Sequence, residues 1–102
     1  MNAYILNDAG TPVLEPDMMK WALWFEAANR MIDVTELPDG VTVSTVFLGS
    51  DHAFGGGEPL LFETMIFGGA LDEMQCRYAT RQAAIAGHAY YVGEAKMAAS
   101  SL

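Results

Sequence analysis

Cysteine is almost absent from this chain, since Cys76 is the single cysteine among 102 residues. No disulfide can therefore form within the chain, and a reducing, cytoplasmic setting is expected. The chain also lacks a run of about 18 apolar residues, so we expect no segment to span a membrane. The stretch MNAYILNDAG has neither the basic start nor the apolar centre of a secretion signal.

Positive charge is scarce as well. The chain has 5 basic and 13 acidic residues, a net charge of −8, and no Lys or Arg between Arg30 and Arg77. The acidic residues of that interval are Asp33, Glu36, Asp39, Asp51, Glu58, Glu63, Asp72 and Glu73. Such a surface repels nucleic-acid phosphates and anionic membranes, so direct binding to either is disfavoured. A protein with a basic surface is the complementary partner, although acidity also serves solubility alone.

The composition describes a folded domain. Hydrophobic residues make up 52% of the chain and charged residues only 18%, which argues against disorder. The length fits a single domain over residues 1–102. Low charge together with many apolar residues also indicates that a partner covers part of the apolar surface.

Hydrophobic periodicity predicts an α+β domain. Helices are expected in EPDMMKWALWFEAANRM and RQAAIAGHAYYVGEAKMA, which are residues 15–31 and 81–98. Strands are expected in residues 3–8, 11–14, 31–37, 41–49, 59–68 and 74–80, with a turn at the PDG that ends at Gly40. This order predicts an antiparallel sheet of four to five strands with two helices packed on one face.

Each predicted helix has a cap and a buried stripe. Asp17 can cap the first helix, whose stripe is Met18, Trp21, Ala22, Phe25 and Ala28, with Trp24 beside it. Thr80 can cap the second, whose stripe is Ala84, Ile85, His88, Tyr91, Val92 and Ala95. Gly87 and Gly93 weaken that helix by about 1 kcal/mol each, but they permit close packing against the sheet.

Apolar residues occupy both faces of the predicted strands. Val43 and Val46 lie on opposite faces of one strand, and Met65 and Ile66 on opposite faces of another. Two helices can cover only one face of a small sheet, so a partner must cover the other. A two-fold homodimer is the commonest solution and is our expectation.

Residues 49–59, GSDHAFGGGEP, are predicted to connect two strands of a hairpin. A phosphate-binding loop is not expected, because Glu58 and Pro59 stand where a cation and a helix are needed. The length and glycine content indicate a contact loop, in which Asp51, His52, Phe54 and Glu58 bind a partner, together with Trp24 if it is exposed. Replacing Asp51, His52 and Phe54 with Ala is then expected to leave the melting temperature nearly unchanged.

Catalysis would need a different use of the polar residues. An enzyme or metal site requires Asp51, His52, Glu63 and His88 to converge. The simpler interpretations are a pair between Glu63 and an arginine, Arg77 or Arg81, and a core-edge position for His88. The candidate nucleophiles Ser44, Ser50 and Cys76 have no recognisable catalytic motif around them. We therefore predict no catalytic residue, no cofactor and no bound metal.

One long stretch is similar to known sequences. VSTVFLGSDHAFGGGEPLLFETMIFGG, residues 43–69, resembles a family of small bacteriophage and prophage proteins of unassigned function. DMMKWALWFEAANRMIDVTEL and RYATRQAAIAGH are similar to that family too, so the resemblance covers roughly residues 11–90. It implies a phage accessory protein in the host cytoplasm, and it carries over no activity, cofactor or catalytic residue.

The leading functional hypothesis is a phage accessory protein that binds another protein. One version is an acidic inhibitor of a host defence system that occupies a nucleic-acid groove, as the mimic type of anti-CRISPR protein does. The alternatives are a small enzyme or metal-binding protein that uses Asp51, His52, Glu63 and His88, and a minor virion assembly factor.

Overall fold

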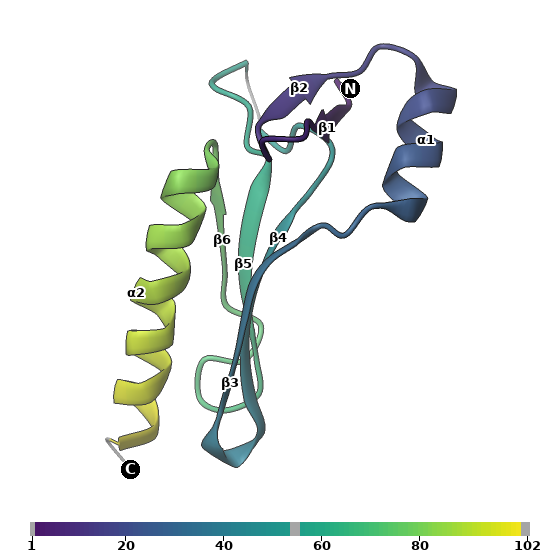
Figure 1. Ribbon diagram of the computed structural model, residues 1–102. Helices are drawn as coiled ribbons and strands as arrows, with labels where there is room; N and C mark the ends of the chain where they lie inside the picture. Colours follow the sequence, from purple (N-terminus) through teal and green to yellow (C-terminus); the bar gives the residue numbers. More distant parts are fainter. Residues whose placement is uncertain (1, 54–55, 101–102) are drawn as a thin grey trace.

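The computed structural model describes residues 2–53 and 56–100, which form two antiparallel sheets and two helices (Figure 1). Strands β1 (Tyr4–Leu6) and β2 (Pro12–Leu14) pair as a small hairpin, and α1 (Met18–Ala27) follows them. The larger sheet contains β3 (Met31–Leu37), β4 (Val41–Phe47), β5 (Phe62–Phe67) and β6 (Gln75–Tyr78), and α2 (Arg81–Ser100) closes the described chain. The predicted α+β class and element order are confirmed.

The four strands of the larger sheet lie side by side in their order along the chain, each antiparallel to the next. The PDG sequence forms a short 3-10 turn, Pro38–Gly40, between β3 and β4, as predicted. Asp39 adopts a φ of 68° there, a backbone conformation that Asp tolerates better than most residues. Each strand of the larger sheet therefore pairs with the strand that comes before or after it in the sequence.

Side chains of β4 alternate between the two faces of the sheet. Val41, Val43, Thr45 and Phe47 are buried, whereas the residues between them are partly exposed. Strand β5 alternates in the same register, since Val43 pairs with Ile66 and Phe47 with Phe62. The sheet thus has one covered face, which carries these buried residues, and one open face.

Helix α2 lies along the covered face and contacts all four strands of the larger sheet (Figure 1). The Thr80 hydroxyl accepts a hydrogen bond from the Ala83 N–H at 3.1 Å, so the predicted cap is confirmed. Ala84, His88 and Ala95 are the buried residues of this helix. The inclusion of Ile85 in the buried stripe was wrong, because its position is 100° around the helix from Ala84 and its side chain is 52% exposed.

The core between α2 and the sheet consists of two apolar clusters with a polar layer between them. One cluster contains Val41, Val43, Ile66 and Ala95, and the other contains Phe47, Leu61, Phe62 and Ala84. Buried polar residues separate them: Thr45 on β4, Thr64 on β5 and His88 on α2. The apolar core is therefore interrupted in its middle.

The N-terminal lobe, defined here as residues 3–28, packs against one end of the sheet. Asp17 caps α1 as predicted, because its Oδ1 accepts hydrogen bonds from the N–H groups of Met19 and Lys20. The Trp21 indole N–H donates to the carbonyls of Tyr4 and Gly49, at 3.1 and 2.9 Å. A single indole therefore ties α1 to β1 and to the end of β4.

The stripe predicted for α1 is partly wrong. Trp24 faces inward and meets the Phe47 ring edge-on, with the ring centroids 5.8 Å apart. Met18 is 59% exposed and Ala22 is exposed as well. The two bulky indoles determine which side of the helix faces the sheet, and this rotates the buried side away from Met18.

The molecule is elongated, with principal extents of 49 × 30 × 21 Å and a radius of gyration of 14.9 Å. A compact domain of this length has a radius of gyration of about 13 Å. The excess reflects the N-terminal lobe, which extends beyond the end of the sheet (Figure 1). Within the described residues, no helix combines the length and the apolar character that a membrane crossing requires.

Gly87 is required where α2 crosses β6, and Gly93 is not. A Cβ at position 87 would overlap the Tyr78 ring, whereas a Cβ at 93 would meet nothing within 4 Å. We expect Gly87→Ala to lower the free energy of unfolding by about 2 kcal/mol through overpacking. Gly93→Ala is the matched control and should raise it by about 0.5–1 kcal/mol, because Ala is the better helix former. Urea denaturation of both variants is the measurement, and equal effects would contradict the packing seen here.

Candidate functional site

The glycine-rich stretch 48–61 connects the antiparallel strands β4 and β5, so the predicted hairpin is confirmed. Asp51 organises this connection. Its Oδ1 accepts hydrogen bonds from the N–H groups of Ala53, at 2.8 Å, and Leu60, at 3.1 Å. The carboxylate therefore ties the two ends of the loop together. Loss of this carboxylate should lower the free energy of unfolding by about 1–2 kcal/mol. This replaces the expectation that Ala at position 51 leaves the melting temperature nearly unchanged.

The other loop residues of the predicted contact set have separate positions. The His52 N–H donates to the Leu60 carbonyl at 3.1 Å, and its ring Nε2 lies 3.3 Å from the Ser50 hydroxyl. Glu58 is exposed, and Phe54 lies outside the described residues. The loop thus exposes Glu58, while His52 is half-buried and Asp51 binds the backbone.

The residues of the alternative enzyme hypothesis lie in different places. Glu63 faces the open side of the sheet, where its Oε2 accepts a hydrogen bond from Arg77 Nε at 2.9 Å. His88 lies on the covered side, 3% exposed. Asp51 and His52 belong to the loop beyond the strands. In the described part of the chain, no group of three or more His, Cys, Asp or Glu side chains could hold a metal ion.

His88 is the centre of a buried hydrogen-bond network. Its Nδ1 lies 2.7 Å from the Thr45 hydroxyl, and its Nε2 lies 2.9 Å from the Thr35 hydroxyl and 3.6 Å from a carboxylate oxygen of Asp33. Thr45 in turn lies 2.6 Å from Thr64, which accepts a hydrogen bond from the Tyr78 hydroxyl at 3.0 Å. The network therefore links all four strands of the sheet to α2.

One assignment of protons lets the hydroxyls of Tyr78, Thr64 and Thr45 each donate one hydrogen bond. Tyr78 donates to Thr64, Thr64 to Thr45, and Thr45 to His88 Nδ1. The His88 proton then sits on Nε2 and points toward Thr35 and Asp33. Among the described residues, no buried side-chain nitrogen or oxygen lacks a partner. A satisfied network of this kind holds the sheet together, and the core-edge interpretation of His88 is confirmed.

The pKa values of Tyr78 and Tyr91 are both raised, for different reasons. Burial raises the pKa of Tyr78 to about 12. A side-chain hydrogen bond with Cys76 raises the pKa of Tyr91. Both phenols are therefore neutral over the whole physiological range, which suits a structural role.

The raised pKa of Tyr78 predicts an alkaline loss of stability. The folded-state pKa lies above the unfolded value of about 10, so the contribution is complete below pH 10 and is lost as the pH rises toward 12. In an ultraviolet titration we expect the Tyr78 phenolate to appear last. Tyr78→Phe should remove that late step, whereas Tyr90→Phe should leave it in place. Ionisation of every tyrosine in a single step near pH 10 would contradict this picture.

The three arginine side chains make contacts within the structure. The Arg30 guanidinium lies over the Phe25 ring, 3.9 Å from its centroid, and Nη1 donates to the Phe47 carbonyl at 3.0 Å. Arg77 pairs with Glu63, and Arg81 Nη1 lies 3.5 Å from the Gly10 carbonyl. The exposed basic side chains of the chain are Lys20 and Lys96. The surface is therefore more acidic than the count of basic residues suggests.

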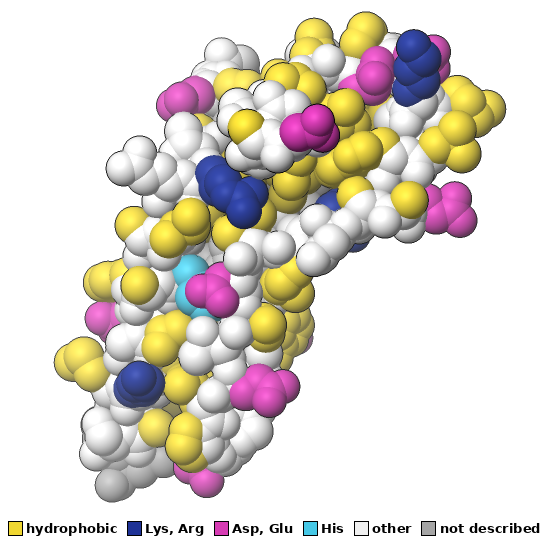
Figure 2. All heavy atoms as spheres, viewed as in Figure 1, with side chains coloured by type: hydrophobic (Ala, Val, Ile, Leu, Met, Phe, Trp, Pro, Cys, Tyr) yellow, Lys and Arg dark blue, Asp and Glu magenta, His cyan; other side chains and the backbone are white. Residues whose placement is uncertain are grey.

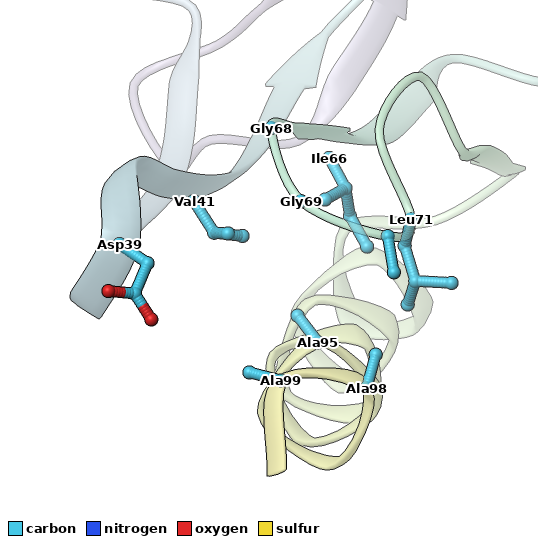
Figure 3. A pocket seen from close by; sticks show the side chains of 10 residues that line it. Asp39, Val41, Ile66, Gly68, Gly69, Leu71, Ala95, Ala98 and Ala99 are labelled. Atoms are coloured by element: carbon cyan, nitrogen blue, oxygen red, sulfur yellow. The ribbon is translucent and has the colours of Figure 1, made fainter. Parts of the chain in front are cut away.

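A small cavity lies where α2 ends beside the sheet (Figure 3). Its volume is about 90 Å³. Ala95, Ala98 and Ala99 face Val41, Ile66 and Leu71 across it, with the Asp39 carboxylate at one side. Cofactor pockets have volumes of about 300–1,000 Å³, so this cavity is a packing gap at the helix end.

The open sheet face forms three rows of neighbouring side chains across the strands. The register gives a row of Met31, Val46, Glu63 and Arg77, a row of Val34, Ser44, Met65 and Gln75, and a row of Glu36, Thr42 and Phe67. Val34 is 49% exposed and Phe67 is 47% exposed. Glu63 and Arg77 neutralise each other, which leaves Glu36 as the uncompensated charge of this face.

The α1 surface, which comprises Leu14, Met18, Met19 and Leu23, brings together four large hydrophobic side chains that are all more than half exposed. Met19 is 70% exposed and Leu23 is 62% exposed. Eight of the ten residues of α1 are apolar, and none of the ten is buried. In Figure 2, hydrophobic side chains cover the outer side of the upper lobe, which α1 forms, and acidic side chains lie above and below them.

Sequence reasoning missed Met19 and Leu23 as surface residues. The available signal was the composition of MMKWALWFEA, which is apolar almost all round, so that one helix face alone cannot bury it. Trp24, which was predicted as a contact residue if exposed, is half-buried against Phe47. No protein-family model, curated protein or solved structure matches this chain.

Proposed function

We propose that this protein acts by binding another protein. The observation that carries the proposal is α1, in which eight of ten residues are apolar and none is buried. A helix that is apolar on most of its circumference is normally buried. Large exposed apolar surfaces on soluble domains mark contact sites. The separation of Asp51, His52, Glu63 and His88 favours binding over catalysis.

The partner carries a basic surface. The three arginines make contacts within the structure, so the exposed surface carries nine exposed acidic residues against the two lysines, Lys20 and Lys96. A field of this sign attracts cationic proteins and accelerates their association. Around α1, Glu15, Asp17 and Glu26 outnumber Lys20.

The resemblance to phage and prophage proteins supports a phage accessory role in the host cytoplasm. Inhibition of a host defence system is one version of that role, and a minor part in virion assembly is the alternative. Nucleic-acid mimicry would need acidic side chains in a regular band. On the face shown in Figure 2 they lie singly between neutral and apolar atoms, which favours ordinary protein recognition on this face.

Crosslinking from α1 tests the proposed function. With a photo-crosslinking amino acid in place of Leu23, we expect a covalent adduct with a basic protein in host cells. Ile85 on α2 is the control position, because its side chain is 52% exposed against 62% for Leu23. Mass spectrometry would identify the adduct. Adducts that form equally from both positions, or from neither, would contradict binding through α1.

A homodimer through the open sheet face is part of the proposal. Two copies of a chain with a charge of −8 repel each other least where the surface is nearly neutral, and Glu36 is the uncompensated charge of this face. Strands of four to seven residues in a four-stranded sheet give a face of roughly 380 Å² per copy. Stable interfaces bury about 800 Å² per partner, so the expected dimer is a weak one.

Light scattering over a micromolar concentration series measures this dimer. We expect the wild-type mass to rise from monomer toward dimer, and Val34→Glu to remain monomeric because it places a charge at the centre of the contact. Ile85→Glu on the outer side of α2 should behave like the wild type. A wild-type protein that stays strictly monomeric at these concentrations would contradict the proposed homodimer.

A further inference from the structure

We propose that the α1 surface binds a cationic amphipathic helix of the partner protein. This inference rests on the proposed function and adds the chemistry of the partner to it.

The apolar part of the α1 surface suits the apolar face of a helix. Residues four apart on a helix lie on the same side, so Met19 and Leu23 form a continuous strip along the outside of α1. The helix has ten residues and is therefore about 15 Å long, which matches roughly three turns of a partner helix packed against it. Methionine side chains are flexible and adapt to the shape of a partner.

A hollow at the start of α1 provides a place for a basic side chain. Its volume is about 200 Å³, and it is lined by Asn2, Ala3, Leu14, Glu15, Pro16 and Met18. Lysine and arginine combine an apolar stem with a charged end. A stem against Leu14 and Met18 would bring that charge to the Glu15 carboxylate.

Charge distinguishes between the possible occupants of this surface. Glu15 and Asp17 lie at one end of α1 and Glu26 at the other, while Lys20 is the basic residue of the helix. A second copy would place these acidic residues against one another, and an anionic membrane would repel them. A cationic helix is attracted to the acidic residues at the start of α1, so it is the occupant that the surface favours.

Trp21 and Trp24 provide the readout. Both tryptophans of the chain lie in α1 and are half-buried, so their emission reports on this helix. The probe is a synthetic tryptophan-free helix of about 18 residues, about 27 Å long, with Leu on one face and Lys on the other. Two control peptides have Glu in place of each Lys, or the same composition in scrambled order.

The tryptophan emission should change saturably with the Leu–Lys helix, with a dissociation constant in the micromolar range, and should not change with either control. Leu23→Glu and the milder Leu23→Gln should weaken binding by about tenfold or more. Glu15→Gln should weaken it less and reduce its salt dependence. Ile85→Glu should leave it unchanged.

Several results would overturn the inference. They are equal binding of the scrambled or Glu-containing helix, equal weakening by Ile85→Glu and Leu23→Glu, and a self-association that Leu23→Glu abolishes. Binding of the Leu–Lys helix that persists in Leu23→Gln and Leu23→Glu would count against it too. If the peptides fail while position 23 still crosslinks to a partner, protein binding stands and the cationic helix is wrong. If the peptides do not bind and position 23 does not crosslink to a partner, both the cationic helix and the proposed function are wrong.

Discussion

The hydrogen bonds between His88 and the threonines of the sheet hold the two layers of this protein together. A small sheet under one helix would ordinarily bury a continuous apolar core, yet here the apolar clusters are separated by Thr45, Thr64 and His88. Each hydroxyl has a partner, so the polar layer adds specificity of register without an orphaned group. A shift of one residue in β4 would remove Thr45 from His88 and expose the valines beside it. The network thus selects the alignment on which the rest of the fold depends.

Most of the fold could be predicted from the sequence because its signals are local. Alternation in VTVSTVF, the PDG turn and the caps Asp17 and Thr80 are each readable within a few residues. The rotation of α1 could not be predicted, since it depends on Trp21 reaching the carbonyls of Tyr4 and Gly49 from a distance of 17 and 28 residues. The exposure of Ile85 could not be predicted either, because it depends on Ala84 being the residue that faces the sheet.

The candidate site was harder to find than the fold. The length and glycine content of the loop predicted contact residues that included Asp51, but Asp51 hydrogen-bonds to backbone N–H groups at both ends of the loop. The exposed α1 surface consists of residues that usually indicate a core. Sequence alone cannot tell whether an apolar residue is buried within its own chain or against another molecule. Only the structure, which places α1 at the end of the sheet, distinguishes burial within the chain from contact with another molecule.

The thioethers of Met18 and Met19 have a chemical consequence. Both side chains are exposed, and peroxide converts such groups to polar sulfoxides. Among the described residues, the buried hydrophobic core contains no methionine. Oxidative damage would therefore alter exposed surfaces, which include the outer side of α1, Met31 on β3 and Met97 on α2, before it reached the buried core. An aged or peroxide-treated sample would keep its melting temperature after its surface had changed, so thermal stability alone is a poor measure of an intact contact surface.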